Sequence, residues 1–143
     1  MALEYKLTLA GSTPQQVAER AFPDMADRPP GTTPLLTMDL YESYGFHIAV
    51  MAGENGYLSA ESDNGLWEWE PKTYVSVTFS LDKSADRRWA VQNVLTTVER
   101  VLSTGAEDAA LTLNADFLLL TRFGGVLVRH RREWWDSYPG ADV

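Results

Sequence analysis

The stretch SDNGLWEWEPKTYVSVTF, residues 62 to 79, contains two successive alternations that predict β-strands. Trp67 and Trp69 alternate with Glu68 and Glu70, and the residues after the proline alternate valine with serine or threonine. A period of two is typical of a strand with one buried face and one exposed face. We therefore expect the tryptophans to face a core and the glutamates to point away from it.

Turn signals on both sides of this stretch predict a central meander of antiparallel strands between residues 35 and 81. Glycine, asparagine and proline punctuate the region at regular intervals, in the segments SYG (43–45), GENG (53–56), DNG (63–65) and EPK (70–72). Such short polar segments between apolar runs are typical of hairpin turns. Each strand of the meander is then expected to pair with the next strand along the chain.

The register of these strands decides which side chains share a face. A two-residue Asn-Gly turn places Glu61 opposite Glu68, and a three-residue loop before that hairpin aligns Val50 with Ala60. Between Asp39 and Asp82, eight acids stand against a single lysine. These acids could form an ordinary solvated sheet face, but like charges on opposite strands destabilise a sheet by roughly 0.2 to 1 kcal/mol per pair, and this cost favours a binding surface. The predicted polar face consists of His47, Ser59, Glu61, Asp63, Glu68, Glu70, Ser76 and Thr78.

The N-terminal part of the chain predicts a strand and a short helix. Apolar and polar residues alternate over residues 3–9, and Thr13 followed by Pro14 is typical of a helix start. This helix is expected to end near Pro23. The segment 24–34 has three prolines and one glycine, which predicts a surface loop.

The C-terminal half predicts a long helix followed by three strands. Apolar residues recur every three or four positions over residues 84–104, and Gly105 stands where a glycine cap commonly ends a helix. The strands are expected at 109–114, 116–123 and 126–132, with glycines 124 and 125 as the turn between the last two.

These elements together predict an α+β fold. A largely antiparallel sheet, made of the central meander and the C-terminal hairpins, is covered on one face by the long helix, and a second short helix lies near the N-terminus. The helix is expected to cover the face that carries Trp67 and Trp69. A chain of 143 residues has the size of one domain with one core, so a single domain over residues 1–143 is expected.

Charge and composition restrict the classes of partner. The net charge is −8, from 20 acids and 12 bases, which opposes binding to nucleic acid or to an anionic membrane and favours a basic protein partner. The absence of cysteine excludes disulfides, thiolate metal ligands and cysteine nucleophiles. No secretory signal or membrane span is recognisable, so we expect a cytoplasmic protein.

Catalytic interpretations are possible but weaker than a binding role. His47 beside Asp63 or Glu61 would suit a metal site or a general base, although a chance polar pair on a strand is commoner than such a site. Glu61, Glu68 and Glu70 could act as a glycosidase pair, but a short meander offers no sugar cleft. We expect no enzyme activity, no metal and no cofactor.

A basic and aromatic segment near the C-terminus has three interpretations. Residues 129–132, of sequence RHRR, with Trp134 and Trp135 could clamp a single-stranded nucleic acid, but the acidic charge of the chain argues against this. A structural role, in which these residues meet acids of the same chain or a neighbouring subunit, is preferred. The two tryptophans could also line an apolar cavity for a small ligand.

Four blocks of the chain resemble a family of small bacterial proteins. They are NGYLSAESDNGLWEWEPKTYVSVTFSLDK, WAVQNVLTTVERVL, EDAALTLNADFLLLTRF and HRREWWDSYPGAD. These blocks are similar to Sit-type immunity proteins, the partners of contact-dependent swarming-inhibition toxins. The resemblance implies a cytoplasmic protein that binds and neutralises a cognate toxin delivered by a sibling cell, and it carries over no individual functional residues.

The acidic residues and the resemblance both favour a protein-binding role. Fixed carboxylates could occupy the basic surface with which a nuclease toxin holds phosphates, and complementary charge would accelerate association. Exposed aromatic side chains, including Tyr41 and Tyr44, would supply the buried anchors that carry most of the affinity. The residues expected to contact the toxin are Glu61, Asp63, Glu68, Glu70, Tyr57 and Tyr74.

Overall fold

The computed structural model describes residues 3–24, 31–32 and 35–143. Its strands are β1 (Glu4–Ala10), β2 (Gly31–Thr32), β3 (Leu35–Leu40), β4 (Phe46–Glu54), β5 (Leu58–Ser62), β6 (Gly65–Trp69), β7 (Thr73–Leu81), β8 (Ala109–Leu113), β9 (Phe117–Phe123) and β10 (Val126–Arg129). Its helices are α1 (Pro14–Ala21), α2 (Tyr41–Tyr44), α3 (Arg87–Ser103) and α4 (Arg132–Asp136).

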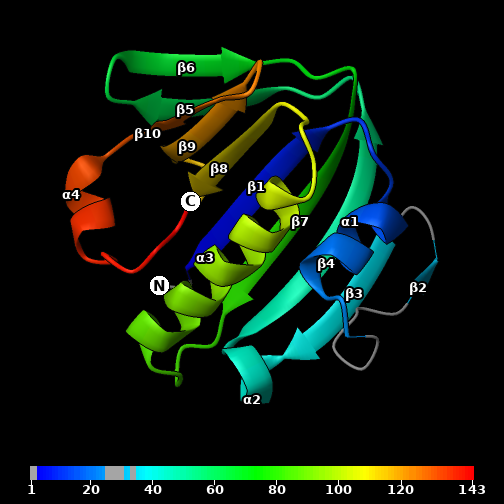
Figure 1. Ribbon diagram of the computed structural model, residues 1–143, viewed down its shortest axis with the longest axis vertical. Helices are drawn as coiled ribbons and strands as arrows, with labels where there is room; N and C mark the ends of the chain where they lie inside the picture. The colour runs from blue at the N-terminus through cyan, green and yellow to red at the C-terminus, as the bar shows by residue number, and fades with distance from the viewer. Residues whose placement is uncertain (1–2, 25–30, 33–34) are drawn as a thin grey trace.

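The strands form one sheet in the order β2-β3-β4-β7-β1-β8-β9-β5-β6, and β10 also pairs with β9 (Figure 1). All pairs are antiparallel except β5 with β9. In the middle of the sheet, Leu7 of β1 lies opposite Val77 of β7 and Leu111 of β8. The predicted α+β class with a largely antiparallel sheet is confirmed.

Helix α3 covers one face of this sheet, as the periodicity predicts, and α1 lies beside it (Figure 1). The side chain of Asp86 caps the helix by accepting a hydrogen bond from the Trp89 backbone N–H at 3.2 Å, so α3 starts three residues after the predicted start. The buried stripe packs on the apolar side chains of β1, β4 and β7. It consists of Ala90, Val91, Val94, Leu95, Thr97, Val98, Val101 and Leu102.

The N-terminal predictions are confirmed in detail. Thr13 caps α1 in a reciprocal capping box with Gln16, and Pro14 is the first helical residue. The predicted loop at 24–34 is not irregular throughout, because Gly31 and Thr32 form β2 and pair with β3. Residues 25–30 and 33–34 of that loop lie outside the described residues.

The predicted meander is correct for the hairpins β3–β4 and β5–β6, but wrong in the pairing of β4 with β5 and of β6 with β7. Strand β4 pairs directly with β7, so that Val50 lies opposite Val77 and not opposite Ala60. The backbone N–H of Asn55 donates to the Lys72 carbonyl at 2.6 Å, which continues the β4–β7 ladder past its last strand residues. Both strands are nine residues long, and their mutual ladder is longer than either could form with β5 or β6. Residues 57–70 therefore form an inserted hairpin, which we call the arm.

The turn at the tip of the arm lies one residue earlier than predicted. Ser62 pairs with Gly65, so Glu61 lies opposite Leu66 and not opposite Glu68. The Ser62 hydroxyl donates to the Gly65 carbonyl at 2.7 Å and accepts a hydrogen bond from the Asn64 N–H at 3.2 Å. Such side-chain to backbone bonds fix the turn at residues 63–64.

The two tryptophans of the arm pack on the sheet face that α3 does not cover. Trp67 and Trp69 join a small cluster with Ala60, Ala110 and Leu118. Ala110 points to the opposite face from its neighbours at 109 and 111, which belong to the core beneath α3. The prediction that α3 covers the tryptophan face is therefore wrong, because the arm leaves β4 and β7 and packs on β8 and β9.

The C-terminal prediction is correct for the three strands, but the third one is shorter than predicted. Strand β10 ends at Arg129, and the chain then forms the short helix α4. The glycines at 124 and 125 make the predicted turn, with φ angles of 58° and 81°. Gly105 is not a left-handed cap. Thr104 caps α3 instead, and Gly105 lies where the side chains of Arg20 and Glu107 leave no room for a Cβ atom.

Candidate functional site

The arm concentrates exposed negative charge. It contains four acids and no base, and all four carboxylates are exposed. They are Glu61, Asp63, Glu68 and Glu70. The structure confirms that Glu61 and Glu68 point away from the tryptophans, because the paired alternation places Trp67 opposite Ala60 and Glu68 opposite Ser59.

The exposed face of the arm carries two large side chains with apolar area, and one of them, Leu66, was not predicted from the sequence. Leu66 is 73% exposed and lies directly opposite Glu61, and Tyr57 is 58% exposed at the start of β5. We call Tyr57, Ser59, Glu61, Leu66, Glu68 and Glu70 the acidic face of the arm. The alternation that places the glutamates on this face also places Leu66 there, and this was the signal that could have identified it.

A hydrogen bond fixes Tyr57 over this face. Its hydroxyl donates to Oε2 of Glu68 at 2.8 Å. This bond is the main reason that the pKa of the Tyr57 hydroxyl is raised above its ordinary value, because the bond exists only while the hydroxyl keeps its proton. The ring and the carboxylate are thus held side by side, and both remain accessible to a partner.

Asp63 attaches the tip of the arm to the C-terminal segment. Its carboxylate accepts hydrogen bonds from the backbone N–H of Arg131 at 3.0 and 3.2 Å. Nδ1 of His130 lies 4.0 Å from Oδ2 of the same carboxylate. Half of the Asp63 side chain stays exposed, so Asp63 both positions the arm and contributes charge to its surface.

Glu70 and Tyr74 lie at the base of the arm. Glu70 is exposed, whereas Tyr74 belongs to β7 and is half-buried. A Cβ atom at Gly53 or Gly56 would overlap the Tyr74 ring, so the ring lies directly on these two glycines. Tyr74 fixes the point where the arm leaves the sheet, and it lies outside the acidic face.

The structure separates His47 from the carboxylates with which it was expected to act. His47 lies on β4, and four strands stand between β4 and β5 in the sheet. The predicted pairing of His47 with Asp63 or Glu61 is therefore wrong, because it depended on β4 being next to β5. Within the described residues, no group of three His, Asp or Glu side chains could hold a metal ion.

The basic segment near the C-terminus has structural contacts. The Arg129 guanidinium lies 4.4 Å from the centre of the Trp135 ring and donates to the Val143 carbonyl. Arg131 lies 4.2 Å from the centre of the Phe117 ring. The preferred structural role is thus supported, but rings and carbonyls take the place of most of the expected acids.

The C-terminal tryptophans do not line an enclosed cavity. Trp135 is 3% exposed, and its indole N–H donates to the Leu119 and His130 carbonyls at 3.0 Å. Trp134 packs against the rings of Tyr5 and Tyr138. An open depression of about 710 Å³ beside Trp134 is lined largely by charged residues, which are Asp63, Arg131, Arg132 and Glu133.

A comparison with protein families identifies the chain. The model of the family described as SitI3-like matches residues 3–139. The chain belongs to the SitI3-like family. This membership implies an immunity protein of a toxin system, as the resemblance of the four blocks indicates. No curated protein and no solved structure matches the chain.

The chemistry available to this SitI3-like protein at the arm is recognition of positive charge. Carboxylates accept hydrogen bonds from lysine and arginine, and an exposed leucine among them offers apolar area for burial. In the part of the chain that the structure describes, no helix is both long and apolar enough to cross a membrane.

Proposed function

We propose that this SitI3-like protein is a cytoplasmic immunity protein that binds and neutralises a cognate toxin through the acidic face of the arm. The observation that carries the proposal is the arrangement of that face. Exposed carboxylates surround an exposed Leu66, and the arm contains no base that would neutralise them. The membership of the SitI3-like family supports the general role, and the arm supplies the specific surface.

The arrangement matches the anatomy of a protein interface. Affinity comes mainly from a few residues near the centre that lose all contact with water, and charges at the rim contribute association rate and specificity. Tyr57 lies at the base end of the face and Leu66 near its tip, and the exposed glutamates lie beside them, with Glu68 bonded to Tyr57 and Glu61 opposite Leu66. The partner surface is therefore expected to combine an apolar pocket with lysine or arginine side chains, and covering that surface inhibits the toxin.

The proposal is tested by the association rate of the purified protein with the cognate toxin domain at increasing salt. The Debye length falls from about 10 Å at 0.1 M salt to about 3 Å at 1 M, so a rate that depends on complementary charge falls steeply over this range. The double variant Glu68→Gln, Glu70→Gln removes two charges from the acidic face. We expect it to associate about ten times more slowly at low salt and to show a weaker dependence on salt.

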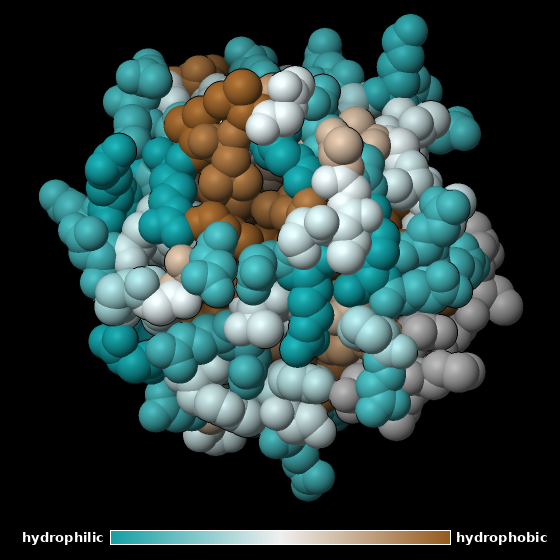
Figure 2. All heavy atoms as spheres, in the orientation of Figure 1, coloured by the Kyte–Doolittle hydropathy of each residue, from teal (hydrophilic) through white to brown (hydrophobic). Residues whose placement is uncertain are grey.

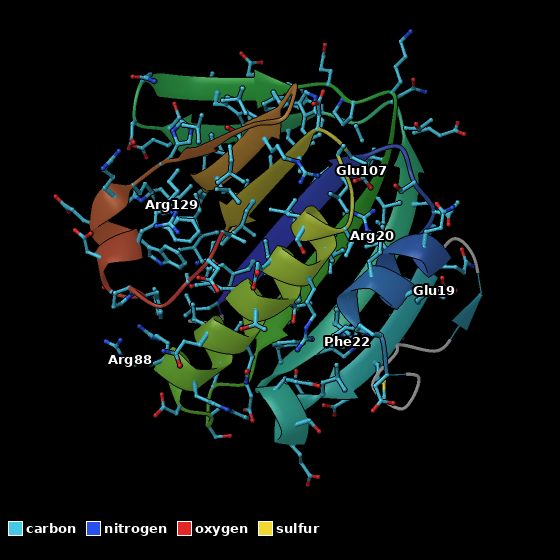
Figure 3. All side chains as sticks on the ribbon, in the orientation of Figure 1. Glu19, Arg20, Phe22, Arg88, Glu107 and Arg129 are labelled. Atoms are coloured by element: carbon cyan, nitrogen blue, oxygen red, sulfur yellow. The ribbon has the colours of Figure 1, made fainter. Side chains whose placement is uncertain are left out.

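The matched control is the double variant Glu19→Gln, Glu42→Gln. It has the same net charge as the first variant, but its substitutions lie on exposed positions of α1 and α2, away from the arm (Figure 3 labels Glu19). The control is expected to keep the association rate of the unmodified protein. If the two variants lose the same rate, the effect belongs to net charge and the arm is not the binding surface.

A further inference from the structure

We infer that β6 binds the toxin by strand addition: an extended basic segment of the toxin pairs antiparallel with the free edge of β6. The inference rests on the proposed function and names how the arm holds its partner. Strand β6 ends the sheet, and Figure 1 shows no element beyond it. An unpaired edge offers a row of backbone donors and acceptors that an incoming strand can use.

One hydrogen bond shows which backbone groups face this edge. The N–H of Glu61 donates to the Asp116 carbonyl at 2.7 Å, so the backbone polar groups of Glu61 point toward β9 and away from β6. In an antiparallel pair these groups alternate in direction along the strand. Ala60 and its partner Trp67 therefore bond to each other across the hairpin. The N–H and C=O groups of Leu66 and Glu68 point outward, to the free edge.

The side chains of β6 define the segment that fits. Leu66 and Glu68 stand on one face with Glu70 beyond them, and Trp67 and Trp69 stand half-buried on the other. Side chains of an added strand lie directly over their opposite neighbours on each face. The fitting segment thus places lysine or arginine opposite Glu68 and Glu70, and small apolar residues opposite the tryptophans.

The charge of the arm excludes a second copy of this chain from the same edge. Pairing of β6 with β6 of another copy brings two arms together, each with four acids and no base. Like charges at this separation oppose the pairing, whereas a basic strand relieves the repulsion. The acidic face thus selects a basic segment and rejects self-association.

The edge of β10 is also unpaired, but it has no acidic side chains that would select a basic segment. The His130 N–H donates to the Leu119 carbonyl at 2.9 Å, so the alternate residues Leu127 and Arg129 present their backbone groups outward. Apart from Arg129, the exposed side chains there are apolar, and Figure 2 shows an apolar patch in this region. They are Val126, Leu127 and Val128. The edge of β10 is therefore the matched control for the edge of β6.

The test measures backbone amide hydrogen exchange by NMR in the full chain, with the peptide acetyl-Lys-Val-Lys-Val-Lys-Val-amide as the probe. Strand addition gives new acceptors to the outward N–H groups, so exchange at Leu66 and Glu68 is expected to slow about tenfold with saturating peptide. Exchange at Leu127 is expected to stay unchanged. Peptide at up to about 5 mM detects binding with a millimolar Kd. If exchange at Leu66 and Glu68 does not slow at this concentration, the inference is overturned.

Modified probes separate backbone pairing from charge attraction. In the antiparallel register the lysines lie opposite Leu66 and Glu68, and their N–H groups point at β6. Methylation of the lysine backbone nitrogens is expected to abolish the protection, and methylation of the valine nitrogens is expected to leave it. Equal effects of the two methylated peptides overturn the inference. The peptide with Glu in place of each Lys is expected to give no protection.

Variants of the protein make the same distinction with the toxin domain. Glu68→Gln removes the charge and keeps the outward N–H, whereas Glu68→Pro removes both, and proline is tolerated at edge positions where the N–H faces solvent. We expect Glu68→Pro to weaken toxin binding at least about tenfold more than Glu68→Gln, and Leu127→Pro on β10 to leave it unchanged. Equal losses from the two Glu68 variants overturn strand addition but leave the proposed function intact. The proposed function is tested separately: an association rate that does not depend on salt would contradict it.

Discussion

At the scale of single residues, Glu107 is the centre of a network that joins three elements. Its carboxylate accepts hydrogen bonds from Arg20 of α1 and from the Ser12 hydroxyl, and Nη2 of Arg122 lies 3.6 Å away (Figure 3). Arg20 also donates to the Thr104 hydroxyl at 3.0 Å and to the Val101 carbonyl at the end of α3. One guanidinium thus satisfies carbonyl and hydroxyl groups at the terminus of the long helix.

This network predicts how stability depends on pH. Burial alone would raise the pKa of Glu107, but the hydrogen bonds from Arg20 and Ser12 outweigh it and lower the pKa from 4.5 to about 2. A lowered pKa means that the ionised carboxylate stabilises the fold fully above pH 4.5, and that this stabilisation is lost as the pH falls toward 2. The variant Glu107→Gln is expected to lose stability at neutral pH and to show a flatter decline in acid.

The measurement is the free energy of unfolding by urea at neutral pH and at several values between the two pKa values. Glu19→Gln, on the exposed side of α1, serves as the control and should keep the pH dependence of the unmodified protein. An unchanged acid decline in Glu107→Gln would contradict the role given to the network.

At the scale of elements, local signals predict the two longer helices, α1 and α3, well. Thr13 and Pro14 fix the start of α1, and the apolar stripe of α3 faces the core as its period requires. These features depend on residues within a few positions of each other. The strand pairing could not be predicted in the same way, because turn signals show where the chain reverses and not which distant strand it meets. The competition between β5 and β7 for the edge of β4 is decided by the length of the whole ladder.

In the candidate site too, features that depend on a single strand were predictable, and features that depend on strand pairing were not. The alternation of β6 correctly placed Glu68 away from Trp67, since this depends on the strand alone. The prediction that His47 lies beside Asp63 or Glu61 was wrong, because it required the pairing of β4 with β5. Helix α4 was missed because five residues that include two tryptophans carry little helical signal on their own.

The packing of the arm predicts a local effect of one substitution. Trp69 lies 5.1 Å from the Phe123 ring in an edge-to-face contact, and with Trp67 it covers Ala110 and Leu118. Trp69→Ala is expected to speed amide exchange in β5 and β6 by about tenfold or more while α3 keeps its protection, since the main core is untouched. Amide exchange followed by mass spectrometry measures this. Equal acceleration in the arm and in α3 would show that the two cores unfold together.

At the scale of the whole molecule, the arm is an insertion between two strands that already pair. The N–H of Gly56 donates to the Pro71 carbonyl at 2.9 Å, so the two ends of the arm lie next to each other. The main core contains no residue of the arm. The structure thus separates the part that specifies the fold from the part that we propose binds the toxin.

This separation predicts that residues 57–70 can be removed without loss of the fold. A chain that joins Gly56 to Pro71 is expected to unfold cooperatively, with reduced stability because Ala110 and Leu118 lose their cover. Toxin association is expected to disappear. Thermal unfolding and association kinetics measure the two properties. Toxin binding by the shortened chain would contradict the proposed function, and failure to unfold cooperatively would contradict the independence of the core.

The central place of β1 has a consequence for how the protein is made. This strand precedes every other described strand, yet its partners are β7 (Thr73–Leu81) and β8 (Ala109–Leu113), which lie in the second half of the chain. During synthesis, its apolar residues Tyr5, Leu7 and Leu9 have no strand partner until β7 has left the ribosome, and they lack their second partner strand until β8 follows. Pairings between distant segments also form slowly, because the entropy of closing a long loop is lost before the contacts form. The central strand of the sheet therefore gains its second partner only late in synthesis, so the fold is completed on a nearly finished chain and not element by element.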